Sequence, residues 1–305
     1  MKRVIIETPY KGINWGDTEE NIRFTRLCGH DCIVRHNEAW FASHLLYTQE
    51  GVLDDKIPEE RALGIEGGFA WKEVADSTVV YVNRGISKGM HFGIHKTISL
   101  GQPFEYRVLP NYPNIIQPKI LTLTGASGVG KTTIARAFLE QNPASKLMTS
   151  FTTRPPRDSD ISGEYNCNLP LAFFENRNKF LWVVQAHGNT YGTTKESVRE
   201  ALSSVMPHLM ILVPEVIPLL RTAVAELSST DGAVAPFYVL SPKEKELARR
   251  LYARGETTSA VEKRVNDCTR WDKKALASDV PYLFLCNDEF GTGIGNAVQQ
   301  MLVFV

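Results

Sequence analysis

A glycine-rich segment that begins at Gly125 carries the clearest chemical signal in the sequence. It matches G-x-x-x-x-G-K-[ST] in full, with a lysine and a threonine in the last two positions. The glycines let backbone N–H groups turn toward a phosphate, and the helix that follows points its positive end at the same anion. In such a loop the lysine bridges the β- and γ-phosphates, and the threonine hydroxyl ligates Mg²⁺. The residues predicted to bind a nucleoside triphosphate are Gly125, Ala126, Ser127, Gly128, Val129, Gly130, Lys131, Thr132 and Thr133, with Thr132 as the metal ligand.

Two arginines lie in a second polar segment, some eighteen residues after Thr132. Arg154 and Arg157 flank a pair of prolines, and serine and threonine residues precede them. Proline restricts the backbone, so the two guanidinium groups are held in a stiff loop. A guanidinium group can grip a phosphate through two parallel hydrogen bonds. We therefore predict a second anion site that faces the first and holds a phosphorylated acceptor.

The loop at Gly125 requires a strand before it and a helix after it, and the sequence provides both. Residues 119–124 read as a strand, and a helix is expected from about Lys131. In both halves of the chain, short apolar runs alternate with longer helical patterns, which is typical of α/β folds. Further strands are expected at residues 3–6, 77–82, 104–108, 209–213 and 236–240, and helices at 19–36, 58–76, 87–100, 244–253 and 259–274.

The chain of 305 residues is long enough for two domains. Pro110, Pro113 and Pro118 exclude a helix and a central strand between them, so residues 110–118 are expected to form a stiff connector. We therefore predict an N-terminal domain at residues 1–109 and a C-terminal domain at residues 119–305. Both are expected to be α/β domains built on parallel sheets.

The charge balance and the cysteines exclude several classes of protein. Lysine plus arginine and aspartate plus glutamate each total 34, so the formal charge is zero and no overall field attracts nucleic acid or a membrane surface. No run approaches the roughly 18 apolar residues of a membrane span. Five cysteines in this length predict a cytoplasmic protein without a disulfide framework. Cys28 and Cys32 lie one helical turn apart near His30 and His36, and we interpret them as buried thiols of a helix rather than as zinc ligands.

The order of motifs in residues 119–305 resembles the guanylate kinase family. After the phosphate loop come S-x-T-T-R-x-P-R, G-E-Y and Y-G-T, and then a segment similar to the family's R-L-x-x-R-G lid. The resemblance implies a P-loop kinase fold that transfers a phosphoryl group from ATP with the help of Mg²⁺. It implies an acceptor site formed by Ser150, Arg154, Arg157, Tyr165 and Tyr191, with Thr194 near the base. Catalysis would fall to Lys131 and Arg154 together with the lid residues Arg250, Arg254 and Arg264.

Two departures from the family pattern leave the acceptor open. The family has an acid at the third position of F-L-E, where it reads the guanine edge, but this chain has Trp182. An aspartate expected at a later strand end is absent, and Glu215 is the nearest acid there. The string from Gln185 to Gly188 also resembles ribose 1,5-bisphosphate phosphokinase, which has no base to recognise. The predicted acceptor is therefore a (deoxy)nucleoside monophosphate or a phosphorylated ribose.

Motifs spread over residues 1–109 resemble a phage and bacterial branch of the nucleoside 2-deoxyribosyltransferase-like domains. They are F-A-S-H-L-L-Y, P-E-E-R and G-I-S-K-G-M. The resemblance implies a flavodoxin-like sheet with a pocket at the carboxyl ends of its strands. The residues expected to line that pocket are Tyr10, Ser43, His44, Asp76, Ser87 and Gly89. The nucleophilic glutamate of working transferases would fall at Gly93, so a catalytic domain and a binding or oligomerising domain both stay open.

Together these observations predict a kinase of nucleotide metabolism that uses ATP and Mg²⁺, joined to a domain that binds or processes a related nucleoside. The pairing suggests nucleotide salvage or modification and a phage origin. The alternative from another class is a nucleotide-binding interaction module without catalysis, as in guanylate-kinase-like scaffold domains. The predicted partners are small nucleotides or phosphosugars and, through the N-terminal domain, a second copy of the chain.

Overall fold

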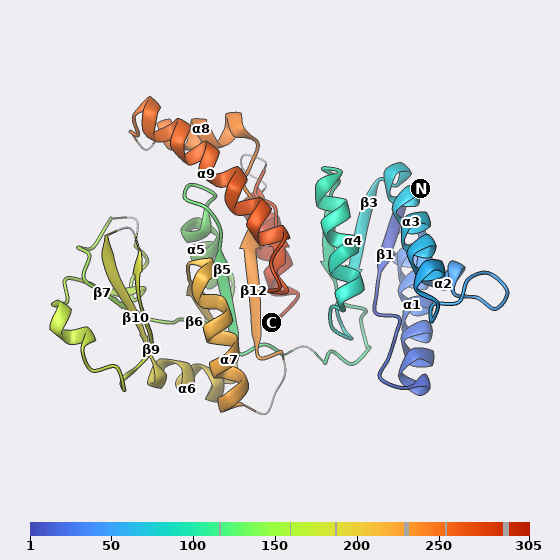
Figure 1. Cartoon of the computed structure of the whole chain (residues 1–305), viewed down its shortest axis with the longest axis horizontal. Coiled ribbons are helices and arrows are strands. Elements are labelled where there is room, and N and C mark those ends of the chain that lie inside the picture. The colour runs from blue at the N-terminus through green and yellow to red at the C-terminus, as the bar shows by residue number, and fades with distance from the viewer. Residues whose placement is uncertain (116, 159, 187, 229–231, 254, 289–292) are drawn as a thin grey trace. The chain divides into compact units, whose positions relative to one another are not determined.

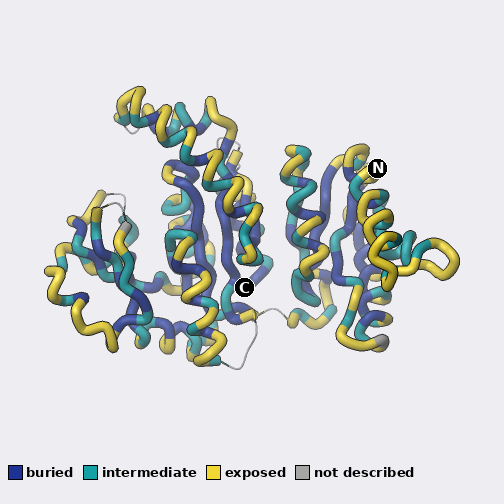
Figure 2. Tube along the Cα trace, in the orientation of Figure 1, coloured by how far each residue is buried: buried dark blue, intermediate teal, exposed yellow. Residues whose placement is uncertain are grey.

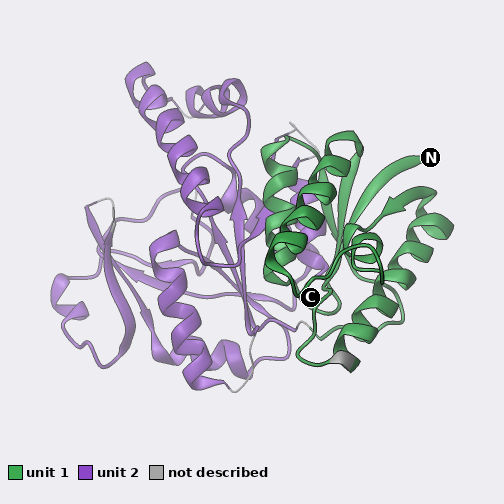
Figure 3. Cartoon of the chain, turned by 45° about the vertical axis from the view of Figure 1, so that its right-hand side comes forward, with its two compact units in different colours: residues 1–116 green, residues 117–305 purple. Residues whose placement is uncertain are grey.

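The chain folds into two compact units in the computed structural model, residues 1–116 and residues 117–305 (Figure 3). The structure describes residues 1–305 except 116, 159, 187, 229–231, 254 and 289–292. Each unit has its own parallel sheet with helices packed against it, which confirms the predicted α/β class. The strands of these sheets are the most deeply buried parts of both units (Figure 2).

Unit 1 is a parallel sheet with strand order β2-β1-β3-β4 (Figure 1). Its elements are β1 (Lys2–Glu7), α1 (Trp15–His36), β2 (Glu38–Phe41), α2 (Ser43–Tyr47), α3 (Pro58–Val74), β3 (Ser77–Tyr81), α4 (Lys88–Ser99) and β4 (Phe104–Arg107). Because β1 lies between β2 and β3, the chain leaves β1 toward one edge of the sheet and later returns to its other side. Such a switch in direction opens a crevice at the carboxyl ends of the strands.

Local sequence explains where the helices of unit 1 begin and end. The side chain of Asn14 accepts a hydrogen bond from the Asp17 N–H and caps α1, which ends at Asn37 in the left-handed conformation. Pro58 occupies the first turn of α3, where its missing N–H costs nothing. The hydroxyl of Ser87 caps α4 by accepting from the Met90 N–H. These caps fix the loops that follow the strands.

The core of unit 1 includes the two thiols of α1. Cys28 and Cys32 are fully buried beside Val79 and Tyr81 of β3, as expected for small apolar side chains of a helix face. Burial raises the pKa of Cys32 to about 11, so this thiol stays protonated at neutral pH. Both residues therefore stabilise the packing of α1 on the sheet.

The proline-rich segment expected as a connector is packed on unit 1 in its first part. The Tyr112 ring lies 4.7 Å from the Phe24 ring, and Asn83 hydrogen-bonds the backbone of both Leu109 and Tyr112. The Ile115 N–H donates to the Asn83 carbonyl at 2.8 Å. Unit 1 accordingly extends beyond residue 109, because these contacts hold the chain to it as far as Ile115.

Unit 2 contains a parallel sheet of order β13-β12-β5-β11-β6 and a separate mixed sheet of order β8-β7-β10-β9 (Figure 1). The parallel sheet and its helices comprise β5 (Ile120–Thr124), α5 (Lys131–Gln141), β6 (Lys146–Leu147), α6 (Lys195–Ser203), β11 (His208–Ile211), η2 (Pro214–Val216), α7 (Ile217–Leu227), β12 (Val234–Val239), α8 (Glu244–Tyr252), α9 (Thr258–Leu276), β13 (Leu283–Leu285) and α10 (Gly293–Leu302). The mixed sheet and its 3₁₀ helix comprise β7 (Ser150–Thr152), β8 (Tyr165–Asn166), η1 (Leu171–Phe174), β9 (Phe180–Ala186) and β10 (Asn189–Thr194).

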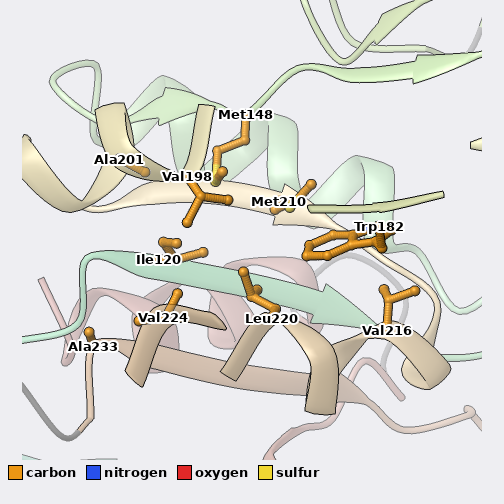
Figure 4. Close-up of a cluster of buried hydrophobic side chains, with 10 residues drawn as sticks. All are labelled: Ile120, Met148, Trp182, Val198, Ala201, Met210, Val216, Leu220, Val224 and Ala233. Atoms are coloured by element: carbon orange, nitrogen blue, oxygen red, sulfur yellow. The ribbon is translucent and has the colours of Figure 1, made fainter. Parts of the chain in front are cut away.

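A buried cluster joins the two sheets of unit 2. It brings Trp182 of β9 together with Met210 of β11, Ile120 of β5 and Leu220 of α7 (Figure 4). Contacts between elements this distant in sequence fix the mixed sheet relative to the parallel one. They therefore also fix the residues that the mixed sheet carries relative to the phosphate loop.

Candidate functional site

The predicted phosphate loop connects β5, the middle strand of the parallel sheet, to α5. Gly125, Gly128 and Gly130 have φ angles of 139°, 90° and 101°, which side chains of L-residues rarely adopt. This backbone lets successive N–H groups face one point at the start of α5, as an anion-binding loop requires. The geometry therefore suits the β-phosphate of a nucleotide.

Lys131 lies in the first turn of α5 with its ammonium group over this loop. Its Nζ donates to the carbonyl oxygens of Gly125 and Ala126 at 2.8 and 2.7 Å. Thr132 and Thr133 follow in the same turn, with Thr132 only partly buried. Thr132 thus lies at the helix start beside the loop, and its hydroxyl is a hard oxygen ligand of the kind that Mg²⁺ prefers.

Replacing Gly125 by alanine is expected to lower the free energy of unfolding of unit 2 by about 2–4 kcal/mol. The added Cβ would lie 2.6 Å from the Val239 carbonyl oxygen, which is backbone and cannot swing away, at a φ of 139°. Urea denaturation measures the effect. Gly163→Ala is the matched control, since its φ is 83° but its Cβ meets nothing within 4 Å, and about 1 kcal/mol is expected there. Equal losses in the two variants would contradict the close approach at Gly125.

The lid helices α8 and α9 pack directly on the phosphate loop. A Cβ added at Gly128 would lie 3.0 Å from Leu251 and 3.1 Å from Leu247, so α8 covers the loop at this glycine. From α9, Arg264 donates to the Ser127 hydroxyl and forms an ion pair with Glu256 at 2.9 Å. The structure therefore brings Arg264 to the loop.

Arg250 is held by a residue that the sequence analysis missed. Its guanidinium donates to the Asn287 carbonyl at 2.8 Å and to Glu246 at 2.7 Å. The Asn287 side chain in turn donates to the Val129 carbonyl at 2.8 Å. Asn287 thus ties the lid arginine to the phosphate loop, and its position two residues after the strand β13 was the available signal. Arg254 lies outside the described residues.

The acceptor residues come together on the mixed sheet. Ser150 of β7 pairs with Tyr165 of β8, and Tyr191 of β10 pairs with Thr152 of β7. The rings of Tyr165 and Tyr191 lie 6.1 Å apart, and the Arg154 guanidinium lies 4.4 Å from the Tyr165 ring. Two predicted acceptor tyrosines therefore lie beside Arg154, and Ser150 lies on the strand paired with one of them.

A carboxylate that the sequence analysis did not identify holds Arg154 in place. Asp160 accepts two hydrogen bonds from the Arg154 guanidinium at 2.8 and 2.9 Å, and it also accepts from the Arg157 N–H. Arg154 is only 4% exposed. The two parallel hydrogen bonds orient the guanidinium group so that it lies over the Tyr165 ring. The Arg157 side chain, by contrast, is exposed.

The other acceptor predictions have different outcomes. The Thr194 hydroxyl accepts a hydrogen bond from the Ser197 N–H and caps α6, so its contact with a base stays a prediction. Trp182 is 7% exposed and its ring packs in the buried cluster with Met210 and Val216 (Figure 4). Glu215 is exposed in η2. The position of the family's guanine-reading acid is therefore occupied by a core tryptophan.

Unit 1 has a cavity of about 530 Å³ at the carboxyl end of β1. Its lining includes five of the six residues predicted there: Tyr10, Ser43, His44, Ser87 and Gly89. The prediction for Asp76 was wrong. Asp76 precedes β3 at the amino end of that parallel strand, and it forms an ion pair with Arg3 at 2.8 Å.

The partly buried imidazole of His44 is expected to make unit 1 less stable in acid. Its Nε2 lies 3.0 Å from the Thr8 hydroxyl, and burial lowers the pKa of His44 to about 4. Its pKa in the folded state lies below the ordinary value of about 6.5, so protonation favours the unfolded state. The contribution of neutral His44 to the free energy of unfolding is therefore complete above pH 6.5 and is lost as the pH falls toward 4. Between pH 7 and 5 the loss amounts to about 2 kcal/mol, measurable by urea denaturation. His44→Gln should remove this part of the pH dependence; an unchanged dependence in that variant would contradict it.

These features define the class of protein. A parallel sheet whose middle strand leads through a positive-φ glycine loop into a helix, with a lysine over the loop, is the nucleotide-binding unit of P-loop phosphotransferases. A model of the guanylate kinase family matches residues 117–292. The chain belongs to the guanylate kinase family, and it is a nucleotide kinase.

Curated relatives agree with the family match. The guanylate kinase of Nostoc sp. is 31% identical over 181 residues, which cover 58% of this chain and 86% of the relative. That of Clostridioides difficile is 30% identical over 177 residues, which cover 57% of this chain and 82% of the relative. The crystal structure of guanylate kinase from Anaplasma phagocytophilum covers 61% of this chain and 83% of its own, with a TM-score of 0.43 and 18% identity.

The N-terminal unit matches a different family from the one predicted. The family model over residues 2–107 is a domain of unknown function (DUF7768), and it is not a deoxyribosyltransferase family. Among the described residues, no helix is long and apolar enough to cross a membrane.

Proposed function

We propose that unit 2 transfers the γ-phosphoryl group of ATP to the phosphate of a (deoxy)nucleoside monophosphate. The observation that carries this is the cluster of Arg154, Tyr165 and Tyr191 on a sheet joined to the phosphate loop by a common core. Phosphoryl transfer needs alignment and neutralisation of spread negative charge more than a strong base. Lys131 and the arginines supply that charge.

Each residue of unit 2 has a distinct role in this proposal. The loop N–H groups and Lys131 bind the triphosphate, and Arg154, oriented by Asp160, binds the acceptor phosphate with Arg157. Arg250 and Arg264 lie on the lid helices that cover the loop and would neutralise the transferred group. Thr132 would hold Mg²⁺, which would withdraw negative charge from the phosphates of the nucleotide.

The acceptor is proposed to be read without a guanine-specific acid. Position 182 holds a tryptophan that packs in the core, so no carboxylate is available there for the guanine edge. A site that lacks a polar partner for a base loses discrimination by orders of magnitude. Steady-state ADP formation should therefore give the guanine nucleotides GMP and dGMP no more than about a tenfold advantage in kcat/KM over dTMP, dCMP and modified deoxynucleotides. A preference for the guanine nucleotides of a hundredfold or more would refute this proposal.

A phosphorylated ribose is the second candidate acceptor, and the same buried tryptophan favours it. The phosphate grip of Arg154 and Tyr165 would serve a phosphosugar equally well, because neither residue reads a base. Ribose 1,5-bisphosphate belongs in the same acceptor panel. ADP formation with this compound and with none of the nucleotides would assign the phosphosugar reaction. If no compound of the panel supports ADP formation, the nucleotide-binding interaction module without catalysis is the remaining function.

Unit 1 is proposed to bind a nucleoside related to the substrate of unit 2. Whether it also processes that nucleoside is decided by the exchange experiment below. The cavity at the carboxyl end of β1 supports this, since open α/β sheets bind ligands at such a switch point. Incubating the full chain with a deoxynucleoside and a second free base tests for deoxyribosyl exchange. Appearance of the exchanged nucleoside would assign catalysis, and binding without exchange would assign a sensor. Self-association through unit 1, a cytoplasmic location and a phage origin stay predictions.

A further inference from the structure

The cavity of unit 1 contains a carboxylate that the sequence analysis did not foresee. Glu7 is the last residue of β1, and its side chain lines the cavity. Its Oε1 lies 2.8 Å from the Lys72 ammonium group, and the two side chains are 14% and 2% exposed. Glu7 is therefore presented to the cavity from within the sheet rather than from a surface loop.

Lys72 fixes this carboxylate in one orientation. Besides Glu7, its Nζ donates to the hydroxyl groups of Thr78 and Thr97 at 3.2 Å each, so its three protons are all used. A lysine this buried requires an anionic partner, because an unpaired charge there would be strongly unfavourable. Among the described residues, Glu7 Oε2 accepts no hydrogen bond. That oxygen can therefore accept one from a ligand.

Gly93 of α4 makes room for Glu7. A Cβ added at Gly93 would overlap the Glu7 carboxylate, with Oε1 as its nearest atom. The resembled transferases would have a glutamate at position 93 of α4, where this chain has glycine. Glu7 of β1 brings a carboxylate to the same point. This close approach explains why position 93 has no side chain.

The remaining lining limits what the cavity can bind. Tyr10, Phe69 and Phe92 supply flat apolar surface, which suits a planar ring. The ion pair of Glu7 and Lys72 carries no net charge. Lys11 and Lys88 of the lining have no acidic partner among the described residues. The lining as a whole has four Lys or Arg side chains and three Asp or Glu side chains, so a cationic ligand gains no net attraction there. An ionised carboxylate is a strong acceptor for hydroxyl groups.

We propose that Glu7, held by Lys72, binds the sugar hydroxyl groups of a nucleoside or nucleoside 5′-phosphate in the cavity of unit 1. This rests on the proposed role of unit 1 in binding a nucleoside, and it identifies the residue that recognises the sugar. The planar base would lie against the aromatic side chains. Glu7 then acts as a binding residue at the end of β1.

Calorimetric titration of the full chain tests the proposal with nucleosides, their 2′-deoxy forms, their 5′-phosphates and the free bases. Nucleosides should bind, and Glu7→Gln should weaken their binding by about 10- to 100-fold, because a charged hydrogen-bond acceptor is lost. Free bases should bind at least tenfold more weakly and should not respond to Glu7→Gln, since they lack the sugar. Nucleoside 5′-phosphates are also expected to bind unit 2, so only the part of their binding that is lost in Glu7→Gln reports on the cavity of unit 1. A measurable loss would show that the cavity accepts a nucleoside that carries a 5′-phosphate.

Three further variants keep the test decisive. Glu73→Gln is the matched control, because Glu73 lies next to Lys72 in α3 but pairs with Lys96 on the surface. Glu7→Gln/Lys72→Met removes both charges, so it should fold if the single variant does not, and it should bind nucleosides as weakly. Gly93→Ala should also weaken binding by displacing the carboxylate. The phosphotransfer rate should be unchanged in all of them.

The outcomes separate this proposal from the one on which it rests. Nucleoside binding that is equally strong in wild type, Glu7→Gln and the double variant would overturn the role of Glu7 while leaving unit 1 a nucleoside-binding domain. Absence of nucleoside binding to the wild type at millimolar concentration would overturn both. Equal weakening by Glu73→Gln would show a general effect of charge and would also overturn the role of Glu7.

Discussion

Replacing Lys131 with alanine is expected to reduce kcat for phosphotransfer by at least about a thousandfold. The Lys131 ammonium lies over the loop at 2.8 Å from the Gly125 carbonyl and 2.7 Å from that of Ala126. It can therefore reach the β- and γ-phosphates of a nucleotide bound there. Without Lys131, the negative charge that develops between these phosphates loses a cation that the loop itself provides. A coupled assay of ADP formation at saturating ATP and acceptor measures the loss.

Arg136→Ala is the matched control for this variant. Arg136 is an exposed cation on the same helix, one and a half turns beyond Lys131. Its removal should change kcat by less than twofold, and both variants should unfold at the same urea concentration as the wild type. Turnover in Lys131→Ala within tenfold of the wild type would remove the phosphate loop from the mechanism.

Arg154→Ala is expected to lower kcat/KM for the phosphorylated acceptor by about 100- to 1,000-fold. The buried Arg154 guanidinium is fixed by two hydrogen bonds to Asp160 and stacks on Tyr165. We expect the N–H groups of Arg154 that Asp160 does not use to bind the acceptor phosphate. Arg154→Lys should recover only a small part of the loss, since an ammonium group offers no planar fork. The KM for ATP should stay within about threefold, which distinguishes an acceptor defect from a general one.

A control variant in unit 2 tests whether loss of any arginine in this region lowers activity by disturbing the fold. Arg199→Ala removes an exposed arginine of α6 that pairs only loosely with Glu196, at 3.8 Å. It should leave both kinetic constants unchanged. Because Arg154→Ala also leaves Asp160 unpaired, Arg154→Ala/Asp160→Asn should be more stable than the single variant but equally inactive. Recovery of activity in the double variant would show that Arg154 acts only on stability.

The phosphate loop was predictable because all of its requirements are local. The loop glycines, Lys131 and the flanking strand and helix follow one another within about twenty residues, and the structure places them as the spacing indicates. The mixed sheet was not predictable in the same way. Strands such as β8, two residues long, exist only because residues distant in sequence pair with them. Local propensity carries no signal for such pairing.

The site residues that were missed or misplaced follow the same division. Asp76 was assigned to the wrong end of β3, although in a parallel sheet only residues after a strand reach its carboxyl end. The same rule would have found Glu7, which ends the buried strand β1, and Asn287, which follows β13. Asp160 had a weaker signal, an acid six residues after Arg154 in a proline-restricted loop. Trp182 could be identified as a departure from the family pattern, but its burial depends on contacts with distant elements.

Phosphorus NMR of the reaction mixture shows directly whether the γ-phosphoryl group of ATP is transferred to an acceptor. The full chain is incubated with ATP, Mg²⁺ and each acceptor of the panel, and the γ-phosphate is followed. We expect the γ-phosphate signal to disappear as ADP and a newly phosphorylated acceptor form in equal amounts. Lys131→Ala and Arg154→Ala should each suppress both products. ATP that stays intact with every acceptor, or yields only ADP and inorganic phosphate, would contradict this expectation.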